Sequence, residues 1–352
     1  MNFKKSLTAL FLAMALLFAS ACDKGSRDIE NTNAGTSSSV SEQKPAPSDG
    51  FNIIGNTLYD SNGNEFVMRG INHAHVWFQD KLDEALQGIA NTGANCVRVV
   101  LGDGNSTNGW GPTSEEEIKN IIQKCKDKNL ICILESHNGT GSDNAADLDK
   151  AVEYWIKVKD TFIGEEKYVI INISNEWYGS WKKLDKWRDA YVGAVKKLRG
   201  AGIRNTIMVD SAGWGQCAES IAKYGKDILD ADPDKNTMFS IHMYGSAGGN
   251  KNQIKTAVDN ALDKDLCFVI GEFGWNHSDG DVDEAYIMEY CTEKKVGYLG
   301  WSWKGNGGGV EYLDIALDWE GKALSENWGE VLVNGPNGIK ETSNICSVFN
   351  KK

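Results

Sequence analysis

Basic residues are scarce in this chain compared with acidic ones. It has 37 Lys and Arg against 49 Asp and Glu, which gives a net charge of −12. Nucleic acids and anionic lipid surfaces are themselves negatively charged and bind basic surfaces. The composition therefore excludes nucleic acid and a bare lipid surface as expected partners of the folded part, and it favours a neutral polymer as substrate.

Sequence signals for a metal ion or a nucleotide cofactor are also missing. No Cys and His residues have the spacing of a zinc site, and no aspartate-rich loop of the calcium-binding kind is present. An open nucleotide-binding sheet would carry a glycine-rich phosphate loop after its first strand, and the segment Met68–His73 contains none. We therefore expect no metal and no cofactor.

A long hydrophobic run is absent as well. The longest apolar stretch of the N-terminus, Leu7 to Phe18, follows a basic start and is too short to cross a bilayer. It leads into Ala19-Ser-Ala-Cys22, which resembles a bacterial lipoprotein box except that Ala19 replaces the usual Leu. We expect residues 1–22 to be a signal peptide, Cys22 to be acylated, and the protein to be a cell-surface lipoprotein. The alternative is ordinary secretory cleavage near Ala21.

Cysteine is present, but not in the pattern of a disulfide-stabilised protein. Without Cys22, seven Cys remain, an odd number for an exported chain. Cys96, Cys132 and Cys267 lie inside apolar, strand-like runs, and others fall in helical patterns. We expect them to be small buried side chains.

From residue 66 the chain repeats an apolar run, a polar loop and an amphipathic helix. Eight strands alternating with helices predict an α/β protein with a closed (β/α)8 TIM barrel, and an open doubly wound sheet is the alternative. The predicted strands are 66–72, 94–101, 130–136, 168–174, 206–211, 238–244, 267–273 and 297–303. The predicted helices lie near 80–91, 113–128, 146–162, 183–200, 217–229, 250–263, 282–294 and 325–333.

The expected domain organisation follows from this repeat. Residues 23–50 are rich in Ser, Thr, Asn, Gly and Pro and predict a flexible linker. Residues 51–334 form the single catalytic domain, which begins with a β-hairpin at 51–63 that covers the barrel floor, and residues 335–352 are a C-terminal tail.

Two carboxylates at the ends of predicted strands carry most of the functional information. Glu176 ends the run Tyr168–Trp177, and Glu272 ends the run Cys267–Trp275. An unpaired carboxylate out of water is costly, so a purely structural strand gains nothing from one. Two Glu residues at one rim of a barrel suit acid/base cleavage of a glycosidic bond.

Other polar and aromatic residues come at the same strand ends, where TIM barrels build their active sites. Trp rings suit the apolar face of a pyranose, and amide and imidazole groups can bind its hydroxyls. Each residue alone could be structural, but together they predict a sugar-binding groove. The set is Asn72, His73, Arg98, His137, Asn175, Trp214, His242, Tyr244, Trp301 and Trp303.

The ordered series of motifs resembles glycoside hydrolase family 5, and within it the bacterial endo-β-1,4-mannanases. The resemblance covers about residues 51–334. It rests on Gly-Ile-Asn-His-Ala-His, Val-Arg-Val-Val-Leu, Asn-Glu-Trp-Tyr-Gly-Ser-Trp, Ser-Ile-His-Met-Tyr, Ile-Gly-Glu-Phe-Gly-Trp, Trp-Ser-Trp-Lys-Gly-Asn and Gly-Gly-Val-Glu-Tyr-Leu-Asp.

This resemblance implies roles for individual residues. Glu176 would be the general acid and then the base, and Glu272 the nucleophile of a retaining double displacement. Asn175 would bind the substrate near the 2-hydroxyl, and Arg98 and Tyr244 would keep Glu272 ionised. His73, His137, Trp214 and His242 would contact the sugars, with Trp301 as the stacking platform. Trp303 would extend that wall or fill the barrel.

Three measurable expectations follow from the implied roles. The two carboxyl groups should lie about 5–5.5 Å apart. The pKa of Glu176 should be raised and that of Glu272 lowered. The substrate should be a mannan-type polysaccharide and the enzyme a monomer; a cellulase and a non-catalytic glycan-binding lipoprotein are the alternatives.

Overall fold

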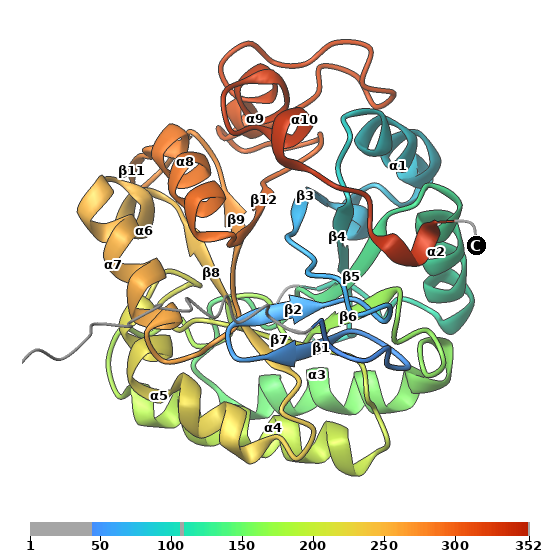
Figure 1. The fold of residues 1–352 in the computed structure, drawn as a ribbon, viewed down its shortest axis with the longest axis vertical. Helices are drawn as coiled ribbons and strands as arrows, with labels where there is room; N and C mark the ends of the chain where they lie inside the picture. The colour runs from blue at the N-terminus through green and yellow to red at the C-terminus, as the bar shows by residue number, and fades with distance from the viewer. Residues whose placement is uncertain (1–43, 106–108, 351–352) are drawn as a thin grey trace, which may run out of the picture. The chain divides into compact units, whose positions relative to one another are not determined.

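The computed structural model describes residues 44–105 and 109–350, which belong to one compact unit that starts at Lys44. Its centre is a closed barrel of eight parallel strands in the order β12-β3-β4-β5-β6-β7-β8-β9 (Figure 1). The barrel strands are β3 (Arg69–His73), β4 (Cys96–Leu101), β5 (Ile131–Ser136), β6 (Val169–Asn172), β7 (Ile207–Asp210), β8 (Thr237–Met243), β9 (Phe268–Phe273) and β12 (Gly297–Gly300).

Helices follow the strands in sequence and surround the barrel (Figure 1). They are α1 (Leu82–Asn91), α2 (Glu115–Asp127), α3 (Ala145–Val158), α4 (Leu184–Gly200), α5 (Ala218–Ala231), α6 (Gly245–Gly248), α7 (Lys251–Leu262), α8 (Glu284–Lys294), α9 (Gly329–Asn334) and α10 (Ile339–Thr342). Short 3-10 helices span His75–Trp77, Gln79–Lys81, Lys159–Thr161, Glu311–Leu313 and Ser347–Phe349. No helix in the described ranges is long and apolar enough to cross a membrane.

The predicted (β/α)8 barrel is confirmed, with element bounds shifted by a few residues. Each barrel strand is fully buried, as expected for a parallel sheet covered by helices. Between the sheet and the helices lies a continuous apolar core. The sequence patterns missed α6, α10 and the small hairpin of β10 (Asn276–His277) and β11 (Gly280–Asp281).

The amino-terminal end of the barrel is closed by an apolar cluster, which we call the floor. The predicted hairpin is present as β1 (Asn52–Ile54) and β2 (Thr57–Tyr59), and it contributes Phe51 and Leu58 to the floor. Inside the barrel these side chains meet residues near the starts of the strands, including Ile131 and Met208. The hairpin therefore covers the floor, as predicted.

Segments outside the expected catalytic domain also pack on this end. Cys346 belongs to the floor cluster, and Ser347 Oγ donates a hydrogen bond to Asp60. The Ser48 amide donates to the Ser61 carbonyl at 2.9 Å. Residues close to both ends of the described chain are thus part of the folded unit.

The seven Cys residues of the described part are all buried free thiols, as the sequence predicted. Cys96 and Cys132 lie in barrel strands, and Cys125 and Cys291 lie in helices. The signal peptide, Cys22 and most of the predicted linker lie outside the described residues, and the expectations for them stay predictions.

Candidate active site

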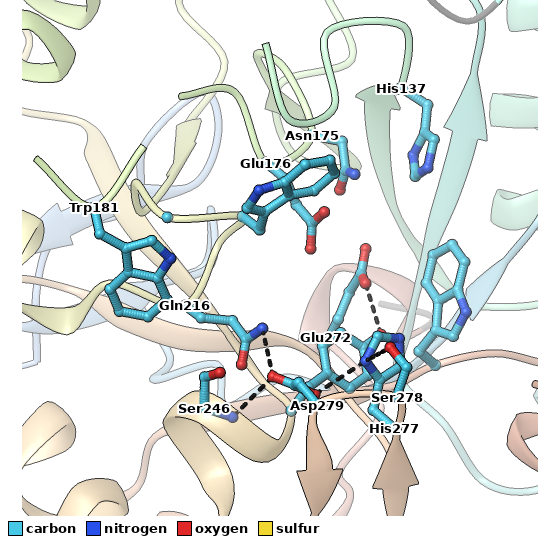
Figure 2. Close-up of a pocket in the computed structure, with 14 residues that line it drawn as sticks. His137, Asn175, Glu176, Trp181, Gln216, Ser246, Glu272, His277, Ser278 and Asp279 are labelled. Carbon is cyan, nitrogen blue, oxygen red and sulfur yellow. Dashed lines mark hydrogen bonds and ion pairs between the residues drawn. The ribbon is translucent and has the colours of Figure 1, made fainter. Parts of the chain in front are cut away.

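Glu176 and Glu272 face each other across a cavity of about 550 Å³ at the carboxyl ends of the strands (Figure 2). Glu272 lies in β9, and Glu176 follows the end of β6. One oxygen of each carboxyl group and one ring nitrogen of His242 lie within 4.8 Å of one another. Nearest oxygens this close suit a pair of the retaining kind, whose carboxyl groups lie ~5–5.5 Å apart, whereas inverting enzymes keep theirs ~6.5–9.5 Å apart.

Arg98 organises the bottom of this site. Its guanidinium is fully buried in β4, where Nη1 donates to Glu272 Oε1 at 2.7 Å and Nη2 donates to Asn175 Oδ1 at 2.7 Å. Nε donates to Asn172 Oδ1 at 2.8 Å, and Nη1 also donates to Asn72. A buried cation is tolerable when its donors are all used and carboxylates surround it. Arg98 therefore fixes the positions of the side chains of Glu272 and Asn175 relative to each other.

Glu272 is the better stabilised anion of the pair. Besides Arg98, the Tyr244 hydroxyl donates to its Oε2 at 2.8 Å. Even so, burial raises the pKa of Glu272, with His242 and Arg98 opposing that rise. The expectation of a lowered pKa is therefore wrong for this site without substrate, because desolvation outweighs the nearby cation.

Glu176 is held in an unusual backbone conformation by its neighbours. Its φ is +44°, in the left-handed region that non-glycine residues rarely adopt. Its amide donates to Asp210 Oδ2 at 3.0 Å. The side chain is 12 % exposed, and burial, reinforced by the nearby Asp210 carboxylate, raises the pKa of Glu176 to about 8. The expected rise is confirmed, and it keeps a proton on this carboxyl group at neutral pH.

His242 joins the acid candidate to the buried Asp210. Its Nδ1 lies 2.7 Å from Glu176 Oε1 and its Nε2 lies 3.5 Å from Asp210 Oδ2. Burial lowers the pKa of His242, so the ring is neutral. With Glu176 protonated, its hydroxyl can donate to Nδ1 in the tautomer that carries the ring proton on Nε2. In that tautomer His242 accepts a hydrogen bond from the acid candidate.

His137 and Trp301 form the wall at the other end of the cavity. Their rings are stacked, with centroids 6.0 Å apart and an interplanar angle of 17°. His137 Nδ1 lies 3.2 Å from both oxygens of Glu135. Although burial alone would lower the pKa of His137, Glu135 raises it. Trp77 and Trp110 pack edge-on against the same imidazole.

Most of the other predicted residues also line the cavity. Asn175 and Tyr244 are in its wall, and Trp214, which is 49 % exposed, covers its rim. The Trp214 ring lies over Gly141, where a Cβ would come within 2.1 Å of it. Glycine at residue 141, with φ +72°, is therefore required for that close approach.

Four of the predicted substrate-binding residues are not among those that line the cavity. Arg98 and His242 are bonded to its two carboxyl groups instead, whereas Trp303 and His73 pack elsewhere. Trp303 is fully buried in the apolar core, and its Nε1 donates to the Trp319 carbonyl at 2.9 Å. His73 is fully buried and packs against the rings of His75 and Trp319. Burial lowers its pKa to about 3, so it is neutral. The assignment of Trp303 and His73 to substrate binding is wrong.

Several site residues were missed in the sequence. Three of them lie in barrel strands and contact the residues described above: Asn172, Glu135 and Asp210. The sequence signal that could have found them is a polar residue inside an apolar run. The others lie outside the barrel strands, in loops, in α6 (Ser246) and in β10 (His277), and have no such signal. They are Trp181, Gln216, Ser246, His277, Ser278 and Asp279.

The same atoms of Glu176, His242 and Glu272 are close enough to act as metal ligands. Arg98 and Tyr244, however, already donate to the two oxygens of Glu272. The bonding therefore suits an ionised nucleophile beside a protonated acid.

Comparison with known proteins agrees with this geometry. Residues 59–307 match the family model described as Cellulase (glycosyl hydrolase family 5). A mannan endo-1,4-beta-mannosidase of Salipaludibacillus agaradhaerens is 49 % identical over 85 % of this chain and 96 % of its own length.

A solved structure and a more distant relative are also similar to this chain. The mannohexaose complex of a Thermomonospora fusca β-mannanase is 39 % identical, with a TM-score of 0.79, covering 86 % of this chain and 99 % of its own. A cellulase of Thermoanaerobacterium sp. is only 25 % identical, over 70 % of this chain and 68 % of its own. The chain belongs to glycosyl hydrolase family 5.

Proposed function

We propose that this protein is a retaining endo-β-1,4-mannanase that hydrolyses mannan-type polysaccharides. The observation that carries the mechanism is the close pair Glu176 and Glu272 with unlike surroundings. One carboxyl group accepts bonds from a guanidinium and a phenol, and the other contacts a neutral imidazole. Such a pair divides the acid and nucleophile roles between its members.

In the first step, the Glu272 carboxylate attacks the anomeric carbon of the sugar at the cavity centre. Glu176 gives its proton to the departing glycosidic oxygen, so that a glycosyl–enzyme ester is formed and the leaving chain departs with a new hydroxyl at its non-reducing end. Arg98 and Tyr244 hold one oxygen each of Glu272, which leaves the carboxylate in a fixed orientation for the attack.

In the second step, Glu176 has become a carboxylate and acts as a base. It takes a proton from water, which attacks the anomeric carbon and releases Glu272. Two inversions at the same carbon give net retention. Proton NMR of the first product from mannohexaose tests this step: the β-anomer should form first, and initial α-anomer would exclude a retaining reaction.

The preference for mannan is supported by the names of the most similar relatives. Mannose differs from glucose in its axial 2-hydroxyl, so polar groups beside that position must discriminate. Asn175 and His137, which line the cavity, are the candidates, with Trp301 setting the height of the ring, whereas His242 acts through its contact with Glu176. A site that hydrogen-bonds a hydroxyl can discriminate against a substrate that lacks it by up to ~10⁴–10⁵-fold in kcat/KM.

The deciding measurement is kcat/KM on mannohexaose against cellohexaose. We expect a strong preference for mannohexaose, and Glu272→Gln serves as the inactive control. Equal or cellohexaose-favouring values would make the protein a cellulase. Tight binding of either hexaose with no hydrolysis would indicate a glycan-binding lipoprotein.

We further propose that the enzyme acts outside the cytoplasm as a monomer held at the cell surface by lipid on Cys22. The proposal rests on the short apolar run and the Ala19–Cys22 motif. Stable anchoring needs at least two acyl chains, which bacterial lipoproteins carry. Cys22→Ala should release active enzyme into the medium. Wild-type enzyme found free in the medium would contradict the anchor.

A further inference from the structure

Glu135 is a fully buried carboxylate that the two-step mechanism does not use. It lies in β5, where Ile131 and Ile133 point inward and belong to the floor cluster. Side chains two residues apart in a strand share a face, so Glu135 occupies the next inward-facing position. An aliphatic side chain would continue this row. A buried carboxylate without partners is costly, so its contacts indicate what it does.

The hydrogen-bonding partner of Glu135 is His137, whose Nδ1 lies 3.2 Å from both carboxylate oxygens. Arg98 Nη1 is 3.8 Å from Glu135 Oε2, which is too far for a hydrogen bond. That nitrogen already donates to Asn72 and Glu272. Because a carboxylate can only accept hydrogen bonds, Nδ1 carries a ring proton. Glu135 therefore fixes the orientation of the imidazole, which lines the catalytic cavity (Figure 2).

The aromatic surroundings of His137 suit a positive charge. The Trp301 ring is stacked on the imidazole, with centroids 6.0 Å apart. Trp77 and Trp110 contact it at steep angles, with centroids at 5.2 and 5.6 Å. The face of an indole ring attracts a cation within about 6 Å of its centroid. Three indoles beside one imidazole thus favour its doubly protonated form.

The charged groups around His137 come from several elements. Burial lowers the pKa of His137, whereas Glu135 in β5 and Glu272 in β9 raise it against the opposing charge of Arg98 in β4. Glu176, which follows β6, also interacts with this imidazole. The net result is a raised pKa. Below that pKa both ring nitrogens carry protons, and above it Nε2 becomes an acceptor.

We propose that Glu135 is a positioning residue that keeps His137 doubly protonated, so that Nε2–H donates a hydrogen bond to an oxygen of the sugar attacked by Glu272. The inference rests on the proposed glycanase activity. A neutral His137 with its proton on Nδ1 would present only a lone pair at Nε2. Glu135 thus decides whether this wall of the cavity donates a hydrogen bond to the substrate or accepts one from it.

The direct test is an NMR titration of ¹⁵N-labelled His side chains, which needs no substrate. The chain has five His, so few ring signals overlap, and His137→Gln identifies the signal of His137. In the wild type this ring should titrate above about pH 6.5, the ordinary value for His. Glu135→Gln removes the charge but keeps the shape, so the midpoint should fall by about one pH unit or more. Glu135→Asp keeps the charge and should restore most of the shift.

Kinetics test the consequence for the substrate. At pH 6.5, Glu135→Gln should lower kcat/KM by about 10- to 100-fold, the worth of a hydrogen bond from a charged donor. Mannohexaose and an aryl β-mannobioside with a good leaving group should lose equally, because Glu272 attacks the same kind of sugar in both. A good leaving group needs little help from the acid. An effect of Glu135 through Glu176 would therefore spare the aryl substrate.

Asp210→Asn is the matched control. Asp210 is also fully buried and lies 3.5 Å from Arg98, but it contacts His242 and not His137. This variant should leave the titration of His137 in place and should spare the aryl substrate. Thermal unfolding checks that each variant is folded.

An unshifted His137 titration in folded Glu135→Gln would overturn the inference, as would an equal shift in Asp210→Asn. A wild-type His137 that titrates below about pH 6.5 would overturn it without any variant. A kinetic loss confined to mannohexaose would show that Glu135 acts through the acid. If the wild type cleaves cellohexaose and not mannohexaose, the proposed mannan specificity fails. The NMR titration and an aryl β-cellobioside then test Glu135 independently.

Discussion

The two ends of this barrel are built from opposite kinds of residues. The floor is apolar, with Phe51, Leu58 and Met208 buried together. The catalytic end buries charges instead, with Arg98 surrounded by carboxylates such as Glu272. Burying apolar surface stabilises the fold, whereas burying several carboxylates around one guanidinium costs desolvation free energy. The comparison indicates that the floor stabilises the folded state, and that this stabilisation offsets the desolvation cost of the charges buried at the catalytic end.

The largest effect that this comparison predicts is on activity, at Glu272. Glu272→Gln removes the nucleophile and should lower kcat on mannohexaose by roughly 10⁴-fold or more. The variant should unfold at the same temperature as the wild type or higher, because a buried carboxylate with a raised pKa has been neutralised. Steady-state kinetics and calorimetry measure the two quantities. A clear loss of stability in this variant would contradict the claim that the charges at the catalytic end cost stability.

The next effect is on stability, at Phe51. Phe51→Ala empties part of the floor and should lower the free energy of unfolding by about 3–5 kcal/mol, measured by urea denaturation. At temperatures where the variant is folded, its kcat should equal that of the wild type, because the floor lies at the far end of the strands. A matching loss of kcat would show that the two ends are coupled.

The smallest effect concerns the pH dependence of the acid. In the wild type, kcat should fall as the pH rises through about 8, where Glu176 loses its proton. Asp210→Asn removes a negative charge that raises this pKa, so the alkaline limb of the pH profile should move to lower pH by up to about one unit. The groups facing Glu176 that remain charged or titratable are Glu135, His137, His242, Arg98 and Glu272.

Asp60→Asn is the floor counterpart of that substitution. Asp60 is a buried carboxylate as well, but it accepts hydrogen bonds from Asn62, Asn64 and Ser347. The alkaline limb should stay in place in this variant while stability falls. If both substitutions move the alkaline limb of the pH profile equally, the shift comes from general destabilisation, and Asp210 does not control the pKa of Glu176.

The sequence predicted the barrel and the approach of Glu176 and Glu272 because both depend on regular patterns. Strands buried on both faces are continuous apolar runs, and a Glu such as Glu272 at the end of one has no structural reason to be there. Trp303 was misassigned because the predicted strand ran to residue 303, so that Trp301 and Trp303 were expected on the same face. In the structure β12 ends at Gly300. Beyond that point the backbone no longer places residues two apart on the same side.

The pKa of Glu272 and the position of Trp181 could not be predicted for a different reason. The pKa depends on how much water reaches the carboxylate, and a sequence gives its neighbours but not the depth of its burial. The position of Trp181 depends on a loop whose path is set by the close approach to Gly213. Such contacts between distant loops leave no periodic signal.

The packing of the C-terminal segment on the floor has a consequence for how the protein is made. All eight barrel strands have been synthesised once Gly300 has left the ribosome, but Cys346 reaches the floor cluster only much later. Until then, the nascent barrel lacks one of its covering side chains and the hydrogen bonds of Ser347 to the hairpin. Chains that terminate before Cys346 would therefore expose the apolar floor. We expect such chains to aggregate or to be degraded by proteases, and not to persist as slightly less stable enzymes.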